Sequence, residues 1–211
     1  LTCDKITRLV LAWDAPAILK VIQESGLVDP RLTHLMTGEH PDGTSRVLAA
    51  WRLLAPLPLA VINVQAGEPL LPVELLPVLH RCVRDGGYEI ATAAAVCSAA
   101  EARDPNVVKV VTGDDGRALY FSRAPVPYQG PYQRHLGVYA YWASFLDATF
   151  PDCPRYRSEH LEQLSWLAAG MKIAVVSLAG VCPAGVDTEE SYRRFVEKTG
   201  VVPAAPASEN A

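Results

Sequence analysis

Apolar residues recur along the chain in short runs between polar turns, and the spacing within each run predicts its secondary structure. Compact apolar runs predict strands at 6–12, 59–64, 88–96, 107–111, 117–123, 136–142 and 173–179. Apolar residues at helical spacing predict helices at 16–26, 45–54, 72–85, 158–169 and 189–198, with Pro77 in the first turn of its helix or at a kink. This alternation predicts a single α/β domain with a mostly parallel sheet, covered by helices on both faces.

Two further features define the expected organisation of the domain. The turn Asp114-Asp115-Gly116 joins two strand-like runs and predicts an antiparallel hairpin inserted into the fold. Residues 202–211 are rich in Ala, Pro and Ser, which predicts a flexible tail after a domain spanning 1–201.

Composition and charge exclude several classes of protein. Half of the 211 residues are hydrophobic and 20% are charged, which favours a globular chain over a disordered one. The net charge is −4 and the basic residues are scattered, so nucleic-acid binding is not expected. No apolar run reaches the ~20 residues of a membrane span. Five cysteines without CxxC or Cys/His spacing predict isolated thiols and a cytoplasmic location.

Two polar segments lie where α/β sheets place their ligands, next to strand ends. The first is His40-Pro-Asp-Gly-Thr-Ser-Arg46, in which a glycine precedes the donor groups of a helix N-terminus. Its alternative interpretation is that Thr44 or Ser45 only caps the helix. The second is Asn63-Val-Gln-Ala-Gly-Glu-Pro69, whose Gln65 amide is suited to reading a base or sugar edge. The alternative there is a polar turn with a solvated Glu68.

Two more segments carry candidate ligands for an acid. Arg123 ends a hairpin strand before a proline-rich loop, where a fixed guanidinium can bind a carboxylate or phosphate; a surface arginine without a ligand is the alternative. His135 and Tyr139 are four residues apart on a strand, so their side chains share one face. Together with Glu159 and the Glu162-Gln163 pair they can line a pocket, or they are ordinary sheet polar residues.

The motifs in these segments match a known family in order and spacing. The segments that carry the match are 40–46, 63–69, Asp104-Pro-Asn-Val-Val-Lys-Val, Leu119-Tyr-Phe-Ser-Arg-Ala-Pro, Arg134-His-Leu-Gly-Val-Tyr-Ala-Tyr, Leu161-Glu-Gln-Leu and Gly185-Val-Asp-Thr. From about Arg8 to Glu197 the chain resembles the 3-deoxy-manno-octulosonate (Kdo) cytidylyltransferases, also called CMP-Kdo synthetases. The resemblance implies the sheet of the nucleotide-diphospho-sugar transferases.

The resemblance also implies a reaction and a set of site residues. In this family the anomeric hydroxyl of Kdo attacks the α-phosphate of CTP, with magnesium assistance, and releases pyrophosphate and CMP-Kdo for lipopolysaccharide synthesis. The implied sugar-acid contacts are Arg123, His135, Tyr139, Glu162 and Gln163, with Arg123 or His135 facing the carboxylate. The implied nucleotide contacts are His40, Gly43, Thr44, Arg46 and Gln65. The implied magnesium ligand is Asp187, and a homodimer is a further expectation from the family.

Several positions depart from the family pattern. No phosphate-cradling loop precedes Ile6, so the first βα unit is expected to be missing, and Gly67 stands where the family has a metal-binding aspartate. Ser45 and Asp42 also replace family residues. The alternative function is therefore a non-catalytic relative that binds only Kdo, CMP or a partner chain. A sialic acid cytidylyltransferase is a second alternative, and a capping role at the start of the last helix is the alternative for Asp187.

Overall fold

The computed structural model describes residues 6–26, 29–149, 159–179, 185–186 and 188–200. The strands in these ranges are β1 (Leu9–Trp13), β2 (Leu32–Met36), β3 (Ala60–Val64), β4 (Ile90–Cys97), β5 (Lys109–Thr112), β6 (Ala118–Ser122), β7 (Tyr132–Trp142) and β8 (Ile173–Leu178). The helices are α1 (Pro16–Glu24), α2 (Gly43–Arg52), α3 (Leu75–Asp85), α4 (Ala99–Ala102), the π-helical turn η1 (Phe145–Thr149), α5 (Glu162–Ala168) and α6 (Glu189–Thr199).

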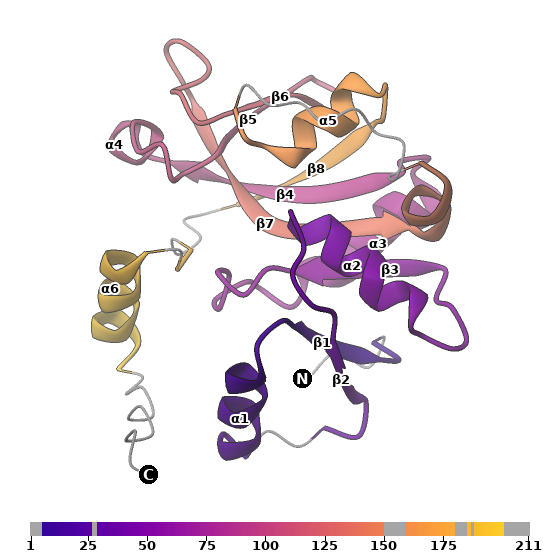
Figure 1. Ribbon diagram of the computed structural model, residues 1–211. Helices are drawn as coiled ribbons and strands as arrows, with labels where there is room; N and C mark the ends of the chain where they lie inside the picture. The colour runs from indigo at the N-terminus through magenta and orange to yellow at the C-terminus, as the bar shows by residue number, and fades with distance from the viewer. Residues whose placement is uncertain (1–5, 27–28, 150–158, 180–184, 187, 201–211) are drawn as a thin grey trace.

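Strand β7 organises the main sheet because it pairs with three other strands. It runs antiparallel to β4 along one edge and antiparallel to both β3 and β5 along the other. Strand β8 extends the sheet in parallel beyond β4, and the β5–β6 hairpin forms the opposite end (Figure 1). The α/β fold class is thus confirmed, with a mixed sheet in which β7 runs against β3, β4 and β8.

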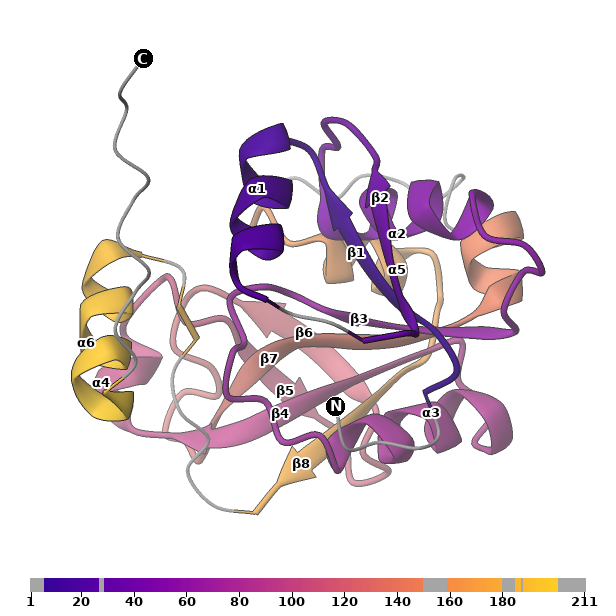
Figure 2. The same cartoon turned by 90° about the horizontal axis from the view of Figure 1, so that it is seen from below.

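A second, smaller sheet consists of β1 and β2. The two strands pair in parallel, from Leu9 opposite Leu32 to Trp13 opposite Met36, and α1 connects them. They lie below the main sheet in Figure 1. In Figure 2, which is seen from below, the pair lies in front of the main sheet. Strand β2 was not predicted, because its Leu-Thr-His-Leu-Met sequence is neither a continuous apolar run nor a regular alternation.

The main sheet is covered on both faces, as the apolar strands predicted. On one face α3 packs Leu75, Leu76 and Leu79 against small residues of β4 and apolar residues of β7. On the other face Trp51 of α2 and Trp166 of α5 pack on a second cluster that includes aromatic residues of β7. Successive residues of a strand point to opposite faces, so β4 and β7 supply both clusters.

Most predicted elements form, with shifted ends. The hairpin and its Asp114-Asp115-Gly116 turn are confirmed, and Pro77 lies in the first turn of α3. Helix α5 begins at Glu162 rather than Ser158, whereas β7 begins four residues earlier than predicted. Helix α6 is capped by Thr188 in a capping box with Ser191, which corrects the suggested Asp187 cap. The predicted tail, 202–211, lies outside the described residues.

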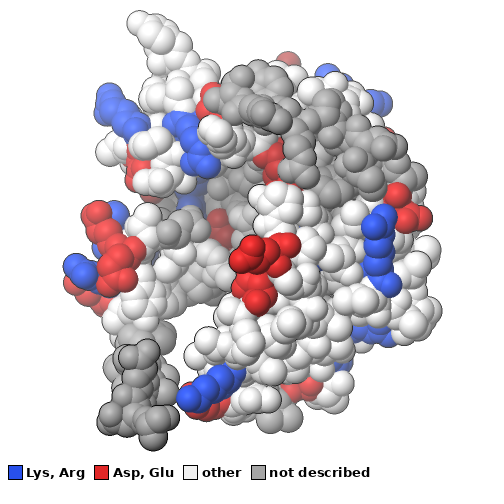
Figure 3. Space-filling model, viewed as in Figure 1, with Lys and Arg blue, Asp and Glu red and all other residues white. Residues whose placement is uncertain are grey.

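The basic residues are scattered over the surface, as the sequence predicts. On the face shown in Figure 3, Lys and Arg side chains are separated from one another and form no continuous basic stripe. Among the described residues, no helix combines the length and apolarity needed to cross a bilayer.

Candidate active site

The first polar segment forms the turn that leads into α2. Asp42 is the N-cap residue, and its Oδ1 accepts hydrogen bonds from Ser45 N at 2.7 Å and Ser45 Oγ at 2.6 Å. The cap is therefore Asp42, and not Thr44 or Ser45 as the alternative interpretation held. An aspartate at this position satisfies an N–H group that has no partner within the helix. This leaves Thr44 free to point inward, where its Oγ1 lies 2.9 Å from the Tyr141 hydroxyl.

The second polar segment follows β3 and packs on a glycine of β7. Gln65 N donates to Gly137 O at 2.9 Å, and the Gln65 side chain lies directly over this glycine. A Cβ on Gly137 would approach Gln65 Oε1 to 2.4 Å, so only glycine leaves room for this side chain. Glu68 is not merely solvated, because its Oε1 accepts a hydrogen bond from Gly137 N at 2.8 Å. This carboxylate therefore fixes the turn after β3 to β7.

Strand β7 contains a bulge at this point. Thr92 of β4 pairs with Tyr139, but the next residue, Ala93, pairs with Leu136, so Gly137 and Val138 face no residue of β4. The hydroxyl of Thr92 lies inside the bulge, 2.7 Å from Val138 O and 2.9 Å from Nε2 of His135. The bulge therefore places a histidine and a buried hydroxyl next to the end of β3.

The side chains of His135 and Tyr139 share one face of β7, as predicted. Their ring centroids are 5.2 Å apart, and the Gln163 amide of α5 donates to the Tyr139 hydroxyl. Burial raises the pKa of Tyr139 well above its usual value. Burial, together with nearby Arg134, lowers the pKa of His135 to about 3. Both side chains are therefore neutral near pH 7.

The carboxyl group of Glu162 is partly buried beside the start of α2. Its Oε2 accepts from Thr44 N at 3.4 Å, and its Oε1 lies 3.9 Å from the position that a Cβ on Gly43 would occupy. Burial and the neighbouring carboxylate of Asp42 raise the pKa of Glu162 to about 7. Glu162 can therefore exchange a proton near neutral pH.

Arg123 is held rigidly at the end of β6. Its Nε donates to Glu159 O at 3.2 Å and its Nη1 to Pro105 O at 2.9 Å. Glu159 also accepts from Arg123 N at 2.8 Å, and Lys109 Nζ donates to Arg123 O at 2.5 Å. The Nη2 group makes no hydrogen bond to the described residues, so Arg123 keeps donors for a ligand in a fixed orientation.

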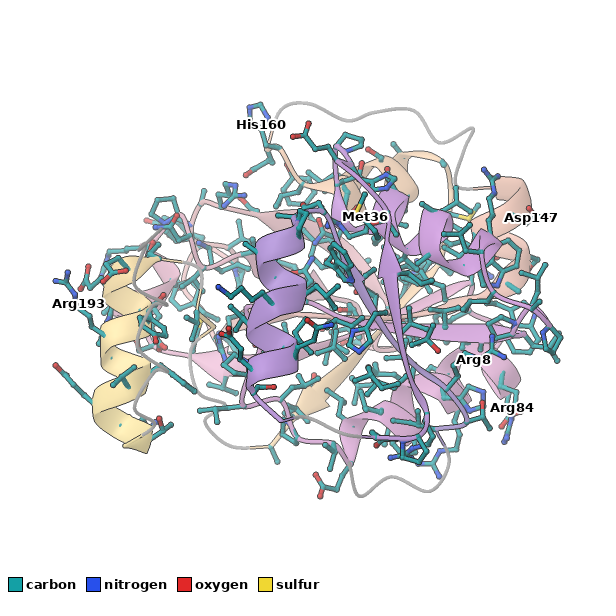
Figure 4. All side chains as sticks on the ribbon, turned by 60° about the horizontal axis from the view of Figure 1, so that its bottom comes forward. Arg8, Met36, Arg84, Asp147, His160 and Arg193 are labelled. Atoms are coloured by element: carbon teal, nitrogen blue, oxygen red, sulfur yellow. The ribbon has the colours of Figure 1, made fainter. Side chains whose placement is uncertain are left out.

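His160 lies between Glu159, which contacts Arg123, and the start of α5. Its φ of 52° places it in the left-handed region, which non-glycine residues seldom adopt. This turn lets Glu159 face β6 while Glu162, three residues on, faces the start of α2. The side chain of His160 itself is exposed and points outward from the edge of the molecule in Figure 4.

The structure brings most of the predicted residues into one region. Gly43, Gln65 and Glu162 lie close together, since a Cβ on Gly43 would also meet Gln65 Nε2 at 3.5 Å. The residues that join this cluster through hydrogen bonds, ring contacts or shared neighbours are Thr44, His135, Tyr139 and Gln163. Arg123 joins it only through the 159–162 segment.

Three predicted residues are not seen in that cluster. His40 Nε2 lies 2.8 Å from Thr37 O, and Arg46 forms an ion pair of 2.6 Å with Asp14 near the end of β1. Asp187 lies outside the described residues, but the residue before it, Val186, donates its N–H to Gly67 O at 2.7 Å. The Gly185-Val186 segment therefore reaches the turn after β3.

The described residues do not by themselves fit a magnesium ion. Within these ranges no three His, Cys, Asp or Glu side chains are arranged to hold a metal. Gly67 offers no side chain, and the nearby Glu68 carboxylate is bonded to a backbone N–H group.

Sequence reasoning did not identify several residues that shape the site. Lys109 is fully buried and donates to the carbonyl oxygens of Asp104, Val107 and Arg123. Thr92 fills the bulge of β7, and the amide of Asn63 lies 3.8 Å from the position that a Cβ on Gly43 would occupy. Only Lys109 gave a sequence signal, since a lysine inside an apolar strand needs buried acceptors. The positions of Thr92 and Asn63 depend on strand pairing, which the pattern of residues does not reveal.

A sheet with helices on both faces and polar side chains gathered at strand ends is the architecture in which open α/β proteins bind their ligands. Residues 1–177 match the family model described as cytidylyltransferase. The 3-deoxy-manno-octulosonate cytidylyltransferase of Polynucleobacter necessarius is 41% identical over 201 residues, covering 88% of this chain and 77% of the relative. That of Neisseria meningitidis serogroup A is 36% identical over 209 residues, covering 90% and 81%. The chain belongs to the 3-deoxy-manno-octulosonate cytidylyltransferase family.

Two solved structures are similar to this chain in fold, and the first also carries the name of the family. A CMP:2-keto-3-deoxy-manno-octonic acid synthetase complexed with CTP matches with a TM-score of 0.82 and 29% identity, covering 94% of this chain and 83% of that one. A 4-diphosphocytidyl-2C-methyl-D-erythritol synthase from Anaerococcus prevotii matches with a TM-score of 0.61 at 13% identity, which supports the fold alone.

Proposed function

We propose that this protein transfers the cytidylyl group of CTP to Kdo, producing CMP-Kdo and pyrophosphate for lipopolysaccharide biosynthesis. One observation beyond the family match supports this function. Residues from three separate motifs, Gly43, Gln65 and Glu162, meet beside the bulge of β7, although Gly43 and Glu162 are 119 positions apart in the chain. These are positions at which the family motifs are retained, and they are grouped as a single site requires.

The reaction forms one bond to the α-phosphorus of CTP and breaks another. The anomeric hydroxyl oxygen of Kdo forms a bond to the α-phosphorus of CTP, the bond from that phosphorus to the bridging oxygen breaks, and pyrophosphate leaves with its electron pair. The hydroxyl proton is released. In such transfers the protein chiefly positions the reactants and compensates their charge.

Each group of residues has a separate task in this proposal. Arg123 would bind the carboxylate of Kdo through the donors of its fixed guanidinium. His135, Tyr139, Glu162 and Gln163 would contact the rest of the sugar acid. Gly43, Thr44 and Gln65 would surround the cytidine. His40, which precedes α2, and Arg46, which lies in the first turns of α2, would complete this nucleotide contact.

A magnesium requirement is also part of the proposal, and it rests on Asp187 in the Gly185-Val-Asp-Thr motif. Magnesium is usually held by one or two carboxylates and by substrate phosphates, so one carboxylate is a minimal protein contribution. When bound, the ion would compensate phosphate charge. Gly67→Asp would add a carboxylate beside the segment that precedes Asp187, and we expect this variant to bind magnesium more tightly in a calorimetric titration.

The remaining elements of the proposal concern the state of the protein. A homodimer and a cytoplasmic location are expected from the family and from the isolated thiols, respectively. Size-exclusion chromatography with light scattering tests the dimer directly, with a mass of about twice 22.8 kDa expected.

Pyrophosphate release from CTP, Kdo and Mg²⁺ tests the function. We expect turnover with CTP and Kdo together, and none when either is omitted. Replacing Kdo with a sialic acid tests the alternative that the protein is a sialic acid cytidylyltransferase. We expect pyrophosphate release with a sialic acid to be much slower than with Kdo. Binding of Kdo or CMP without any pyrophosphate release would instead support the non-catalytic alternative.

A further inference from the structure

The hydroxyl of Thr92 has three polar neighbours inside the bulge of β7. Its Oγ1 lies 2.7 Å from Val138 O, 3.4 Å from Leu136 O and 2.9 Å from His135 Nε2. Thr92 is fully buried, so no solvent competes for this hydroxyl. The direction of each hydrogen bond is therefore decided among these groups alone.

Counting protons fixes these directions. A threonine hydroxyl carries one proton, and a backbone carbonyl oxygen can only accept. At 2.7 Å, Val138 O must receive the Thr92 proton, because two oxygens at this separation without a proton between them would repel each other. The Thr92 oxygen then has only lone pairs to offer to His135. The hydrogen bond at 2.9 Å consequently needs a proton on Nε2 of His135.

The other ring nitrogen of His135 is left as an acceptor. The ring is packed edge-on against Phe121 and beside Tyr139, and burial and Arg134 favour its neutral form. A neutral imidazole with its proton on Nε2 carries a lone pair on Nδ1. Nδ1 makes no hydrogen bond to the described residues, and His135 remains partly exposed.

We infer that His135 recognises a hydroxyl group of the sugar acid by accepting a hydrogen bond at Nδ1, and that Thr92 is the positioning residue that imposes this role. The inference rests on the proposed function and assigns the polarity of one of its contacts. A carboxylate would face the Nδ1 lone pair without a proton between them, so His135 does not bind the carboxylate. That group is left to Arg123, whose Nη2 makes no hydrogen bond within the part of the chain that the structure describes.

The tautomer can be measured without activity. Nitrogen-15 NMR of the imidazole groups in the full chain distinguishes the two neutral tautomers and the charged form, and the His135→Gln variant assigns the signal among the five histidines. We expect His135 to carry its proton on Nε2 at pH 7 and to stay neutral down to pH 5. A proton on Nδ1, or a charged ring at pH 7, would overturn the inference.

Titration with Kdo tests the ligand contact. Accepting a hydrogen bond shifts the Nδ1 resonance upfield, so this signal should move on saturation while Nε2 stays bonded to Thr92. Binding of Kdo without this shift would overturn the inference and leave the proposed function intact. If Kdo does not bind at all, both the function and the contact are wrong.

Two variants of Thr92 separate positioning from structure. Thr92→Ser keeps the hydroxyl and should retain the tautomer and the KM for Kdo. Thr92→Val has a similar shape but no hydroxyl, and we expect mixed tautomers and a KM for Kdo raised about tenfold, with a smaller change in kcat. An unchanged KM in folded Thr92→Val would contradict the positioning role, and if this variant does not fold, the wild-type spectrum still decides the tautomer.

Discussion

Asp42 and Glu162 accept hydrogen bonds from consecutive N–H groups at the start of α2, Asp42 from Ser45 and Glu162 from Thr44. The two carboxyl groups therefore share one end of a helix although they are 120 residues apart in the chain. Their mutual repulsion adds to the burial that raises the pKa of Glu162. This pairing makes the stability of the site depend on pH.

The first prediction is that Glu162→Gln stabilises the protein at alkaline pH. The folded-state pKa is about 7, above the usual 4.5, so the contribution of Glu162 to stability is greatest below about pH 4.5 and is lost as pH rises through 7. Glutamine is never charged, and we expect a gain of about 1–3 kcal/mol at pH 8 and none at pH 4. Thermal unfolding across this range measures it.

A control for the first prediction is Asp42→Asn, which keeps a capping oxygen but removes the charge. The pKa of Glu162 should fall in this variant, and the pH dependence should weaken. A pH dependence identical in Glu162→Gln and the wild type would contradict the assignment.

The second prediction concerns the glycine under Gln65. Gly137→Ala introduces a Cβ 2.4 Å from Gln65 Oε1, so the amide must leave its position, and we expect the KM for CTP to rise about tenfold, or ~1.4 kcal/mol. Gln65→Ala, which removes the amide without adding a Cβ to β7, is the matched comparison. If the loss arises from Gln65, then adding Gly137→Ala to Gln65→Ala should cause little further change.

The third prediction concerns the carboxylate of Kdo. Arg123→Ala should weaken Kdo binding by about 2 kcal/mol or more, because a charge-assisted pair is removed. Arg84→Ala, which removes an exposed arginine paired with its neighbour Asp85, should leave binding unchanged. Isothermal calorimetry with Kdo compares them, and equal affinities of wild type and Arg123→Ala would refute the assignment.

The fourth prediction concerns the buried lysine behind Arg123. Lys109→Met preserves most of the side-chain volume but leaves three carbonyl oxygens without their shared donor, so we expect a loss of about 2–4 kcal/mol in stability. Lys172→Met, at an exposed lysine, should change stability by less than about 0.5 kcal/mol. Chemical denaturation measures both, and similar values for the two would show that the three hydrogen bonds contribute little.

Much of the fold could be predicted because its signals are local. The Asp-Asp-Gly turn identifies the β5–β6 hairpin by its own chemistry, and apolar spacing identifies α3 with Pro77 in its first turn. Strand β2 lacks such a signal. Its place depends on pairing with β1, which no property of its five residues encodes.

The candidate site could be predicted in part for a similar reason. Motifs identified Gly43, Gln65 and Glu162 as candidates, and His135 and Tyr139 share a face simply by strand periodicity. The role of Thr92 depends on a bulge in another strand, and that of Asp42 on which residue starts the helix. These are properties of the assembled backbone, so they become visible only in the structure.

The pairing of β7 with three other strands also has a consequence for the order in which the chain folds. Its partners β3 and β4 precede it, and the β3–β7 pairs join residues about 80 positions apart. Such long-range pairs close large loops before they gain contacts, which slows folding. During synthesis β3 and β4 do not pair with each other, and neither can pair with β7 until residues 132–142 have left the ribosome. The nascent chain is expected to depend on chaperones mainly in that interval.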